Sequence, residues 1–304
     1  MQTILVTGGG RGLGLVTAGK LARAGHRVVL VARTRQSAED AAAQIRAADP
    51  SARVEPRSAD LSRHSEIRKL AAAIVAEVGV IDVLLNIAGV LQTSPTRRVT
   101  ADGFEETLAV NALAPFLLTA LVFPALVRSD SARIVNVSSR LHLPGSRGRP
   151  VDFDFDDPQL QHGYNPDRAY KNSKLAVMWL SYELQRRLGP RTITVNAVCP
   201  GFVPVTAAAS TSGWLRWMMT HVLPHMPFAT SVDTATDSLV FMALDPSLDG
   251  IGGKFYADRH QIESSAEASD PEQARRFWVL ASSLTRLDPD WPTTSQAPPR
   301  TGRG

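Results

Sequence analysis

Cysteine and lysine are scarce in this chain of 304 residues. Cys199 is the single cysteine, which excludes an internal disulfide framework and a cysteine-rich metal site and fits a reducing compartment. Only five of the 33 basic residues are Lys, and the formal net charge is +4. The basic residues are scattered, without the run that is typical of a nucleic-acid-binding arm. The composition, 44% hydrophobic and 20% charged, predicts a soluble cytoplasmic protein without a nucleic-acid partner.

The sequence also lacks a targeting segment and a clear membrane span. No charged leader precedes the short apolar run at the N-terminus, so we expect no signal peptide. Residues 108–127 imitate a span, with twenty residues free of charge. Because they include Asn111, Pro115 and Pro124 and strand-like segments flank them, we predict a helix buried between a sheet and a neighbouring subunit. A homodimer or homotetramer would fit this interpretation. No His, Asp or Glu cluster has metal-ligand spacing, so no metal site is predicted.

Apolar strand-like runs alternate with helical patterns along the chain. The expected strands are 3–7, 27–32, 53–59, 81–88, 132–139, 192–198 and 252–258. The alternation predicts an α/β fold: a single-domain, doubly wound parallel sheet of the Rossmann type with helices on both faces. We expect the domain to span residues 1–286, with a polar insert at 140–168 and an irregular stretch at 205–230. The tail 287–304 is rich in Pro, Thr and Gly and is predicted to be disordered.

A glycine cluster follows the first strand and opens the first helix. Thr7, Gly8, Gly12 and Gly14 have the spacing T-G-x-x-x-G-x-G, whereas Leu13 breaks the G-x-G-x-x-G pattern. Glycines let the backbone approach a pyrophosphate, and the helix N-terminus supplies N–H donors. A glycine cluster can be a plain turn, but its place between a strand and a helix favours dinucleotide binding.

The end of the second strand distinguishes NAD from NADP. An acid there would hold the ribose 2′-hydroxyl, but the chain has Arg33 and no acid. Arg11, in the glycine loop, adds a second guanidinium, and guanidinium groups suit phosphate in charge and in geometry. Arg33 could be one of many surface arginines. Two loops that converge on one phosphate nevertheless favour NADP(H) over NAD(H).

Tyr170 and Lys174 stand four residues apart near the start of a long helical pattern. Residues at this spacing share one helix face, so the ammonium can lie beside the phenol. A nearby ammonium favours the phenolate and should lower the pKa of the tyrosine, which is ordinarily near 10. Each residue alone would more often be ordinary helix surface.

Several motifs occur in one order along residues 3–285, and by them the sequence resembles the short-chain dehydrogenase/reductase family. They are "TGGGRGLG" (7–14), "ADL" (59–61), "NIAG" (86–89), "VN" (110–111), "IVNVSS" (134–139), "YKNSK" (170–174) and "PGFVPVT" (200–206). The insert and the segment from residue 252 resemble more narrowly the retinol dehydrogenase and protochlorophyllide reductase branch, which acts on large apolar substrates.

The resemblance implies roles for individual residues. Tyr170 would be the acid/base, and Lys174 would tune it and hold the nicotinamide ribose. Ser139, taken instead of Ser138, would bind the substrate oxygen, and Asn111 would support a proton path. The implied cofactor contacts, besides Tyr170 and Lys174, are Thr7, Gly8, Arg11, Gly12, Leu13, Gly14, Arg33, Asp60, Leu61, Asn86, Ala88, Gly89, Pro200, Gly201 and Val203. Ile87 replaces a second Asn of the family, and Thr206 lies one residue later than in the common pattern.

These features predict an oxidoreductase that transfers hydride between NADP(H) and a carbonyl or alcohol on a fairly large apolar molecule. The alternative is an NADP(H)-sensing regulator without turnover. His142 near Ser139 raises a hydrolase interpretation, but Ser139 does not lie in a G-x-S-x-G elbow. Residues 212–228, with two Trp and three Met, could form a substrate lid, an oligomer contact or a membrane-touching surface, and we favour the lid.

Overall fold

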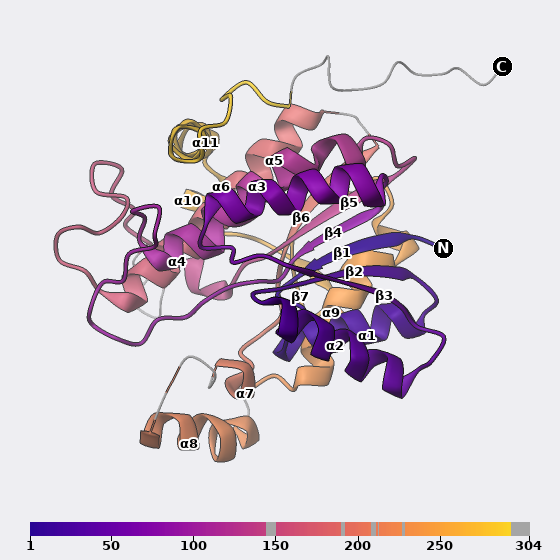
Figure 1. The fold of residues 1–304 in the computed structure, drawn as a ribbon. Helices are drawn as coiled ribbons and strands as arrows, with labels where there is room; N and C mark the ends of the chain where they lie inside the picture. Colours follow the sequence, from indigo (N-terminus) through magenta and orange to yellow (C-terminus); the bar gives the residue numbers. More distant parts are fainter. Residues whose placement is uncertain (144–149, 190–191, 208–210, 212, 227–228, 293–304) are drawn as a thin grey trace.

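An eight-stranded sheet forms the centre of the molecule (Figure 1). The computed structural model describes residues 1–143, 150–189, 192–207, 211, 213–226 and 229–292. Within them the strand order is β3-β2-β1-β4-β5-β6-β7-β8, parallel except for the antiparallel pair β7–β8. The strands are β1 (Thr3–Thr7), β2 (Arg27–Ala32), β3 (Arg53–Ser58), β4 (Val83–Asn86), β5 (Ala132–Val137), β6 (Ile193–Cys199), β7 (Phe255–Ala257) and β8 (His260–Ile262).

The predicted doubly wound α/β fold is confirmed, and the seven expected strands are present within a few residues of their predicted bounds. The short edge strand β8 was missed, because its sequence HQI has no apolar run. β3 contains Pro56, which an edge strand tolerates because one side of its backbone has no strand partner.

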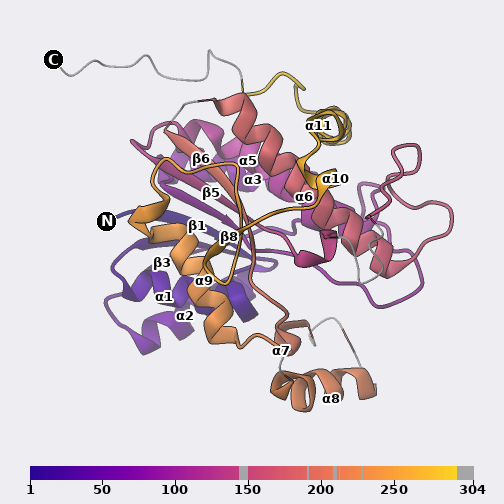
Figure 2. The same cartoon turned by 180° about the vertical axis from the view of Figure 1, so that it is seen from behind.

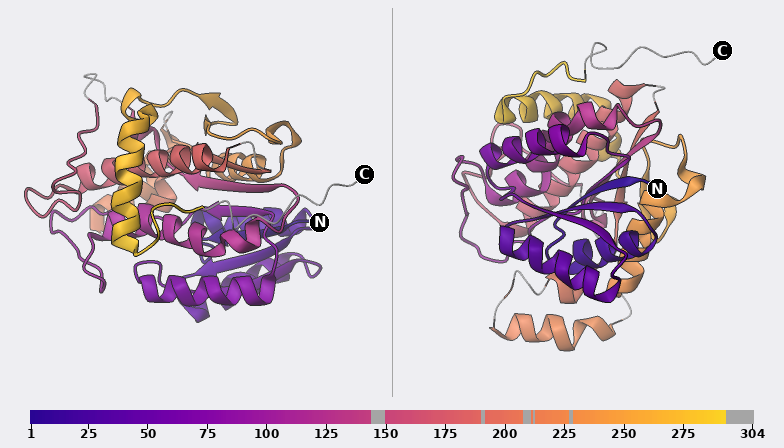
Figure 3. Two further views of the ribbon diagram at one scale, coloured as in Figure 1. Left: turned by 90° about the horizontal axis from the view of Figure 1, so that it is seen from above. Right: turned by 45° about the vertical axis from the view of Figure 1, so that its right-hand side comes forward.

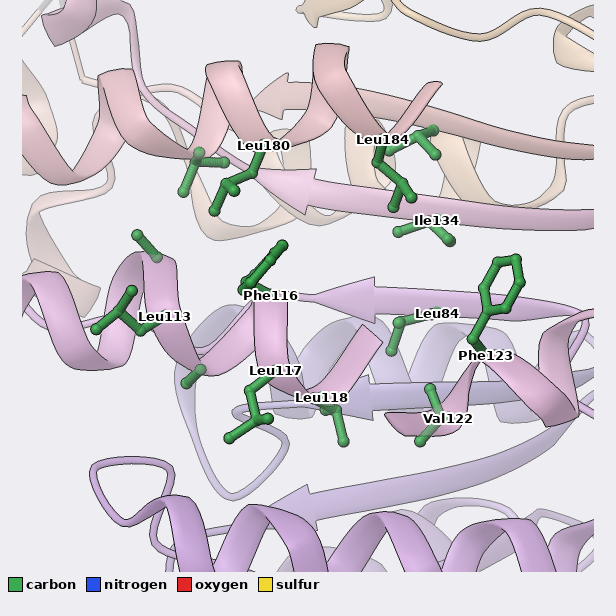
Figure 4. Packing of buried hydrophobic residues seen from close by; sticks show 14 of the residues in the cluster. Leu84, Leu113, Phe116, Leu117, Leu118, Val122, Phe123, Ile134, Leu180 and Leu184 are labelled. Carbon is green, nitrogen blue, oxygen red and sulfur yellow. The ribbon is translucent and has the colours of Figure 1, made fainter. Parts of the chain in front are cut away.

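Helices cover both faces of the sheet (Figures 1 and 2). One layer contains α3 (His64–Ala73), α5 (Ala114–Leu126) and α6 (Pro166–Leu188), whose apolar side chains pack against those of β4 and β5 (Figure 4). The other contains α1 (Gly12–Arg23), α2 (Arg35–Ala48) and α9 (Val232–Leu244). The remaining helical segments are η1 (Ile74–Val78), α4 (Glu106–Leu108), η2 (Ala109–Leu113), η3 (Arg140–His142), α7 (Pro204–Ala207), α8 (Gly213–His221), η5 (Leu223–His225), η6 (Pro246–Leu248), α10 (Ala266–Ser269) and α11 (Pro271–Thr285).

The uncharged stretch proves to be a core helix. Among the described residues, Glu106–Leu126 is one helical run long and apolar enough to cross a membrane, but 78% of its apolar window is buried inside the chain. Helices α3, α6 and α11 of the same chain pack against this helical run, and Phe116 packs edge-on against Trp278 with ring centroids 4.8 Å apart. The neighbouring subunit expected beside it stays a prediction. Figure 3 shows α11, in yellow, lying across α6.

The prediction that the tail is disordered from Leu287 onwards is wrong for its first six residues. Trp291 is only 5% exposed and packs among Phe116, Phe123 and Trp278. Arg187 donates hydrogen bonds to the carbonyl oxygens of residues 289 and 291. The composition of the tail favours disorder, but one tryptophan buries about 200 Å² and thereby orders its neighbours. Residues 293–304 lie outside the described part of the chain.

The two expected irregular segments also contain ordered structure. In the insert, Phe153 and Phe155 pack against Trp179 of α6 with centroid distances of 5.2 and 5.7 Å. Phe153 also contacts Phe277 of α11 at 5.3 Å. The stretch 205–230 contains the helical segments α7, α8 and η5 in its described residues. Aromatic anchors therefore hold the polar insert on the α6–α11 layer.

Candidate functional site

The carboxyl ends of β1, β4 and β5 meet at one edge of the sheet, where the strand order reverses and ligands bind in such folds. Thr7, at the end of β1, donates from Oγ1 to the carbonyl oxygen of Leu85 at 3.3 Å. The same oxygen accepts the N–H groups of Ile87 at 3.1 Å and Ala88 at 3.2 Å. The Thr7 hydroxyl therefore holds the turn after β4 by bonds to the backbone of that turn. Because these bonds do not involve the side chain of Ile87, the replacement of the family's Asn by Ile87 does not loosen β4.

The glycine loop leaves its backbone bare. Gly8 has φ +73°, and a Cβ there would lie 2.9 Å from the Cα of Ala88. A Cβ on Gly14 would lie 2.2 Å from the carbonyl oxygen of Gly8. Helix α1 begins at Gly12 with no side-chain cap from Arg11 and no acid in its first turn. This cradle, with an uncapped helix N-terminus behind it, fits the pyrophosphate of a dinucleotide.

Helix α7 lies against this loop. A Cβ on Gly12 would come 3.0 Å from Cγ2 of Thr206, so the side chain of Thr206 borders the cradle despite its shifted place in the sequence. Gly201 has φ +87°, and a Cβ there would lie 2.0 Å from Oγ1 of Thr230. Pro200 and Val203 are buried on either side of this turn. The segment after β6 therefore lies against the glycine loop at Gly12.

The residues predicted to bind the adenosine part of the cofactor differ in their partners: the arginines are exposed and unpaired within the described part of the chain, whereas Asp60 is bonded within its own turn. Arg11 and Arg33 are exposed, and neither forms an ion pair with another described residue, whereas Arg35 binds Glu39 at 2.7 Å. Asp60 accepts hydrogen bonds from the N–H and hydroxyl of Ser62, so its carboxylate holds its own turn. The two free guanidinium groups are available to a phosphate.

Two predicted cofactor residues lie inside the fold. The Asn86 amide donates to Asn136 Oδ1 at 2.8 Å and to Thr119 Oγ1 at 3.3 Å and is 5% exposed. Its side chain supports the end of β4 from within, and its place in the wall behind the cofactor stays a prediction. Leu61 is partly buried against the core layer of α3 and α5. Ala88 and Gly89, by contrast, lie in the turn that faces the glycine loop and Lys174.

Tyr170, Lys174 and Ser139 are brought together. Lys174 Nζ lies 5.5 Å from the centroid of the Tyr170 ring and donates to the carbonyl oxygen of Val137 at 3.0 Å. Ser139, two residues after Val137, has its hydroxyl beside that of Tyr170. The phenol, ammonium and hydroxyl therefore converge from α6 and the end of β5.

Burial controls the protonation of this pair. It raises the pKa of Tyr170 to about 12, with a further rise from Cys199, while the nearby Ser139 hydroxyl acts in the opposite direction. Burial also lowers the pKa of Lys174 to about 8. We expected the ammonium to lower the pKa of the phenol, but loss of solvation raises it instead. At pH 7 the phenol is protonated and most of Lys174 is an ammonium.

Hydrogen bonds distinguish Ser138 from Ser139. Ser138 is 2% exposed, and its hydroxyl donates to the carbonyl oxygen of Lys174 at 3.0 Å, so it anchors α6. Ser139 accepts the N–H of Leu141 at 3.2 Å and faces Tyr170. The sequence could not separate the two serines, because alternation along a strand places them on opposite faces without showing which face is which.

Asn111 lies in η2, a π-helical turn, and links two segments of the site. Its amide oxygen accepts the N–H of Val90 at 2.7 Å, and its nitrogen donates to the Val90 carbonyl and to Ser173 Oγ, each at 3.0 Å. A Cβ on Gly89 would lie 3.3 Å from this amide oxygen and 3.8 Å from Lys174 Nζ. Asn111 therefore ties the turn after β4 to α6, close to Gly89 and Lys174.

His142 is a site residue that sequence reasoning left without a role. It is fully buried in η3, and its Nδ1 hydrogen-bonds the carbonyl oxygen of Ser139. Its ring packs edge-on against Phe255 at 4.9 Å, and Nε2 has no partner among the described residues. Burial lowers the pKa of His142, so the ring is neutral at pH 7 with its proton on Nδ1. In the sequence, only the three-residue spacing between Ser139 and His142 indicated that His142 lies near the site.

The fold and this site define a class: a dinucleotide-binding α/β domain with a tyrosine, a lysine and a serine at the carboxyl edge of its sheet. No group of three potential metal ligands occurs among the described residues.

Comparisons with known proteins agree with this class. The family model for short chain dehydrogenase matches residues 2–151. Human retinol dehydrogenase 13 is 34% identical over 299 residues, which cover 94% of this chain and 85% of the relative. Human retinol dehydrogenase 14 is 34% identical over 300 residues, 94% of this chain and 87% of the relative.

Solved structures of other proteins have a similar fold. A putative uncharacterized protein from Mycobacterium paratuberculosis has a TM-score of 0.74 and 30% identity, covering 95% of this chain and 94% of its own. An actinorhodin polyketide ketoreductase with NADPH, 24% identical, has a TM-score of 0.63 over 84% of this chain and 95% of its own and supports the fold alone.

The chain belongs to the short-chain dehydrogenase/reductase family. Within it, the chain falls in the retinol dehydrogenase-like branch. It is an oxidoreductase acting on alcohol or carbonyl groups, and the family implies a nicotinamide dinucleotide cofactor.

We expect His142→Leu to lower kcat for carbonyl reduction about fivefold, because a lost hydrogen bond of about 1 kcal/mol leaves Ser139 less firmly placed. Cofactor affinity and the melting temperature should change little. His142→Asn, which retains a donor, should recover part of the rate, and His162→Leu on the exposed insert is the control. Equal losses in the Asn and Leu variants, or a lower affinity for cofactor, would contradict the positioning role.

Proposed function

We propose that this protein is an NADP(H)-dependent oxidoreductase that reduces a carbonyl, or oxidises the matching alcohol, on a fairly large apolar molecule. The convergence of Tyr170, Lys174 and Ser139 beside the glycine cradle is the observation that carries the proposal. A bound nicotinamide dinucleotide supplies or accepts the hydride.

The protein's own side chains manage the proton and the charge on oxygen. When a carbonyl carbon gains hydride, its oxygen becomes negative and needs a proton donor. Tyr170, a phenol whose pKa is about 12, is protonated at neutral pH and can give its proton to that oxygen. The phenolate that remains is stabilised by the Lys174 ammonium and by the Ser139 hydroxyl. In the direction of alcohol oxidation the same groups accept the proton.

The glycine loop and the two free guanidinium groups fit NADP(H). Gly8, Gly12 and Gly14 leave room for a pyrophosphate, and the start of α1 offers its N–H groups. Arg11 and Arg33 would hold the 2′-phosphate. Lys174 would also hold the nicotinamide ribose, and the segment from Pro200 to Val203 would border the nicotinamide.

An apolar substrate is supported by two observations. The relatives are named retinol dehydrogenases, whose named substrate is an apolar alcohol. Exposed apolar side chains also lie on the segment that borders the cradle, at Phe202 and Val205. A cytoplasmic location and a homodimeric or homotetrameric assembly stay predictions of the sequence.

We expect Tyr170→Phe to lower kcat by about 10² to 10⁴, because it removes the proton donor without changing the shape of the ring. NADPH binding, measured by fluorescence titration, should stay within about twofold of the parent because a phenylalanine ring keeps the packing of Tyr170. Tyr182→Phe, on the same helix but bonded to Ser264, should keep full activity with a retinal or long-chain aldehyde substrate. A Tyr170→Phe enzyme that retains a tenth or more of its activity would overturn the mechanism.

The pH dependence should report Lys174. Because its pKa is about 8, the ammonium is present below that pH and lost above it. We expect kcat/KM for carbonyl reduction to fall about tenfold per pH unit above pH 8. Lys174→Met should abolish this limb and retain only a slow, flatter rate. Lys171→Met, which removes a lysine bound to Asp167 on the outside of α6, should keep the parental profile. A flat parental profile through pH 9.5 would contradict the assignment.

Cofactor preference should depend on Arg33. Removing a guanidinium that holds a phosphate costs about 1.5–3 kcal/mol, so Arg33→Ala should weaken NADPH binding roughly 10- to 100-fold. NADH lacks the 2′-phosphate, and its affinity should not change. The control is Arg35→Ala, two residues away and already paired with Glu39. Equal losses for both cofactors, measured by calorimetry, would argue against a 2′-phosphate site.

A further inference from the structure

A segment that we call the α8 arm stands off the body of the protein. Its described residues are Pro204–Ala207 and 213–226, which form α7, α8 and η5. Helix α8 packs chiefly against α7 and η5, its neighbours in the chain. In Figures 1 and 2 it lies apart from the sheet and from the two helical layers. Much of its surface therefore has no protein cover.

The arm exposes large apolar side chains that the rest of the chain buries. Trp214 is 71% exposed and Trp217 54%, whereas the other three tryptophans are at most 5% exposed. Since residues three apart share a helix face, the two indoles project on one side of α8. Val222 and Met226, which follow α8 in the chain, are also exposed, at 41% and 42%. Clustered exposure of this kind marks an interaction surface.

The charge of the arm has one sign. The sequence contains no Asp or Glu between Glu183 and Asp233. On the arm itself Arg216 lies between the two indoles in sequence, and His221 stacks on Trp217 with centroids 5.5 Å apart. Both side chains are exposed. Exposed tryptophans beside an arginine, with no acid nearby in the sequence, are features of segments that lie in a membrane interface.

We propose that the α8 arm docks on the surface of an anionic lipid bilayer. The indoles would enter the boundary between headgroups and acyl chains, and Arg216 would lie at the level of the lipid phosphates. A second copy of the chain fits less well, because a two-fold contact uses the same patch on both copies and the described arm has no acid to pair with Arg216. An acidic membrane surface complements both the charge and the apolar side chains.

The position of the arm gives this docking a consequence for catalysis. Thr206, in α7, borders the glycine cradle at Gly12, and the turn at Gly201 contacts Thr230. The arm therefore joins the body beside the cofactor edge of the sheet. Docking would bring that edge toward the bilayer, where apolar molecules are dissolved. This consequence rests on the proposed function, whereas the binding of lipid does not.

The test uses the full chain, without cofactor or substrate, and sedimentation with sucrose-loaded vesicles at low salt. We expect the protein to sediment with vesicles containing phosphatidylglycerol and far less with pure phosphatidylcholine, and its tryptophan fluorescence to shift to the blue. The double variant Trp214→Gln/Trp217→Gln should lose more than about tenfold in affinity for lipid. Arg216→Gln should lose about fivefold on the anionic vesicles, since one basic residue contributes about 1 kcal/mol there.

Matched controls come from the exposed face of α11. Val279→Ser and Arg275→Gln remove an exposed apolar and an exposed basic side chain outside the arm, and they should sediment like the parent. Circular dichroism should confirm that every variant is folded.

Three outcomes would overturn the proposal. One is a parental protein that stays in the supernatant with anionic vesicles. Another is a double variant that sediments unchanged but, by light scattering, turns from dimer to monomer, which would assign the arm to a second copy. The third is a double variant that sediments unchanged but, in a separate turnover assay, has a raised KM for carbonyl substrate, which would make the arm a lid. Since no turnover is measured in the sedimentation assay, its failure would leave the proposed oxidoreductase function standing.

Discussion

The contact between the end of β5 and the middle of α6 is the constraint on which the site depends. Lys174 Nζ donates to the carbonyl oxygen of Val137, and Ser138 Oγ donates to the carbonyl oxygen of Lys174, each at 3.0 Å. This reciprocal pair fixes the helix against the strand in both position and rotation. Tyr170 lies one turn earlier on the helix and Ser139 follows Ser138, so both functional groups inherit their positions from it. The same contact buries the ammonium, which is why the pKa of Lys174 falls to about 8.

Side chain–backbone hydrogen bonds hold the rest of the sheet edge. Thr7 binds the turn after β4, Asn111 binds both backbone groups of Val90, and His142 binds the carbonyl of Ser139. Each bond ties a loop, which has no strand partner, to a strand end or a helix. Such loops carry function because a rigid scaffold positions them. Here the scaffold acts through a few buried polar side chains, and two of them, Thr7 and Asn111, belong to motifs that the resemblance identified.

The five tryptophans lie in two different environments, three in the core and two on the surface. Trp179, Trp278 and Trp291 pack in the α6–α11 layer, where they order the insert and the first residues of the tail. Trp214 and Trp217 face outward on the α8 arm. The apolar content of a sequence does not distinguish the two, since an indole favours a core and a membrane interface for the same reason. The packing partners decide: Trp278 packs against Phe116 and Trp291 inside the layer, whereas Trp217 has His221 as its ring partner on the exposed arm.

The sequence by itself determined the sheet, the glycine loop and the Tyr170–Lys174 pair, because these follow from local periodicity and short spacings. Tertiary structure decided the rest. Which of Ser138 and Ser139 faces the tyrosine depends on the register between β5 and α6. The Asn86 amide bonds Asn136, since its direction depends on the neighbouring strand. Likewise, the pKa of Tyr170 rises instead of falling because burial is a property of the folded chain. Local sequence shows which groups are present, but solvation and orientation are set by residues that are distant in the chain and adjacent in space.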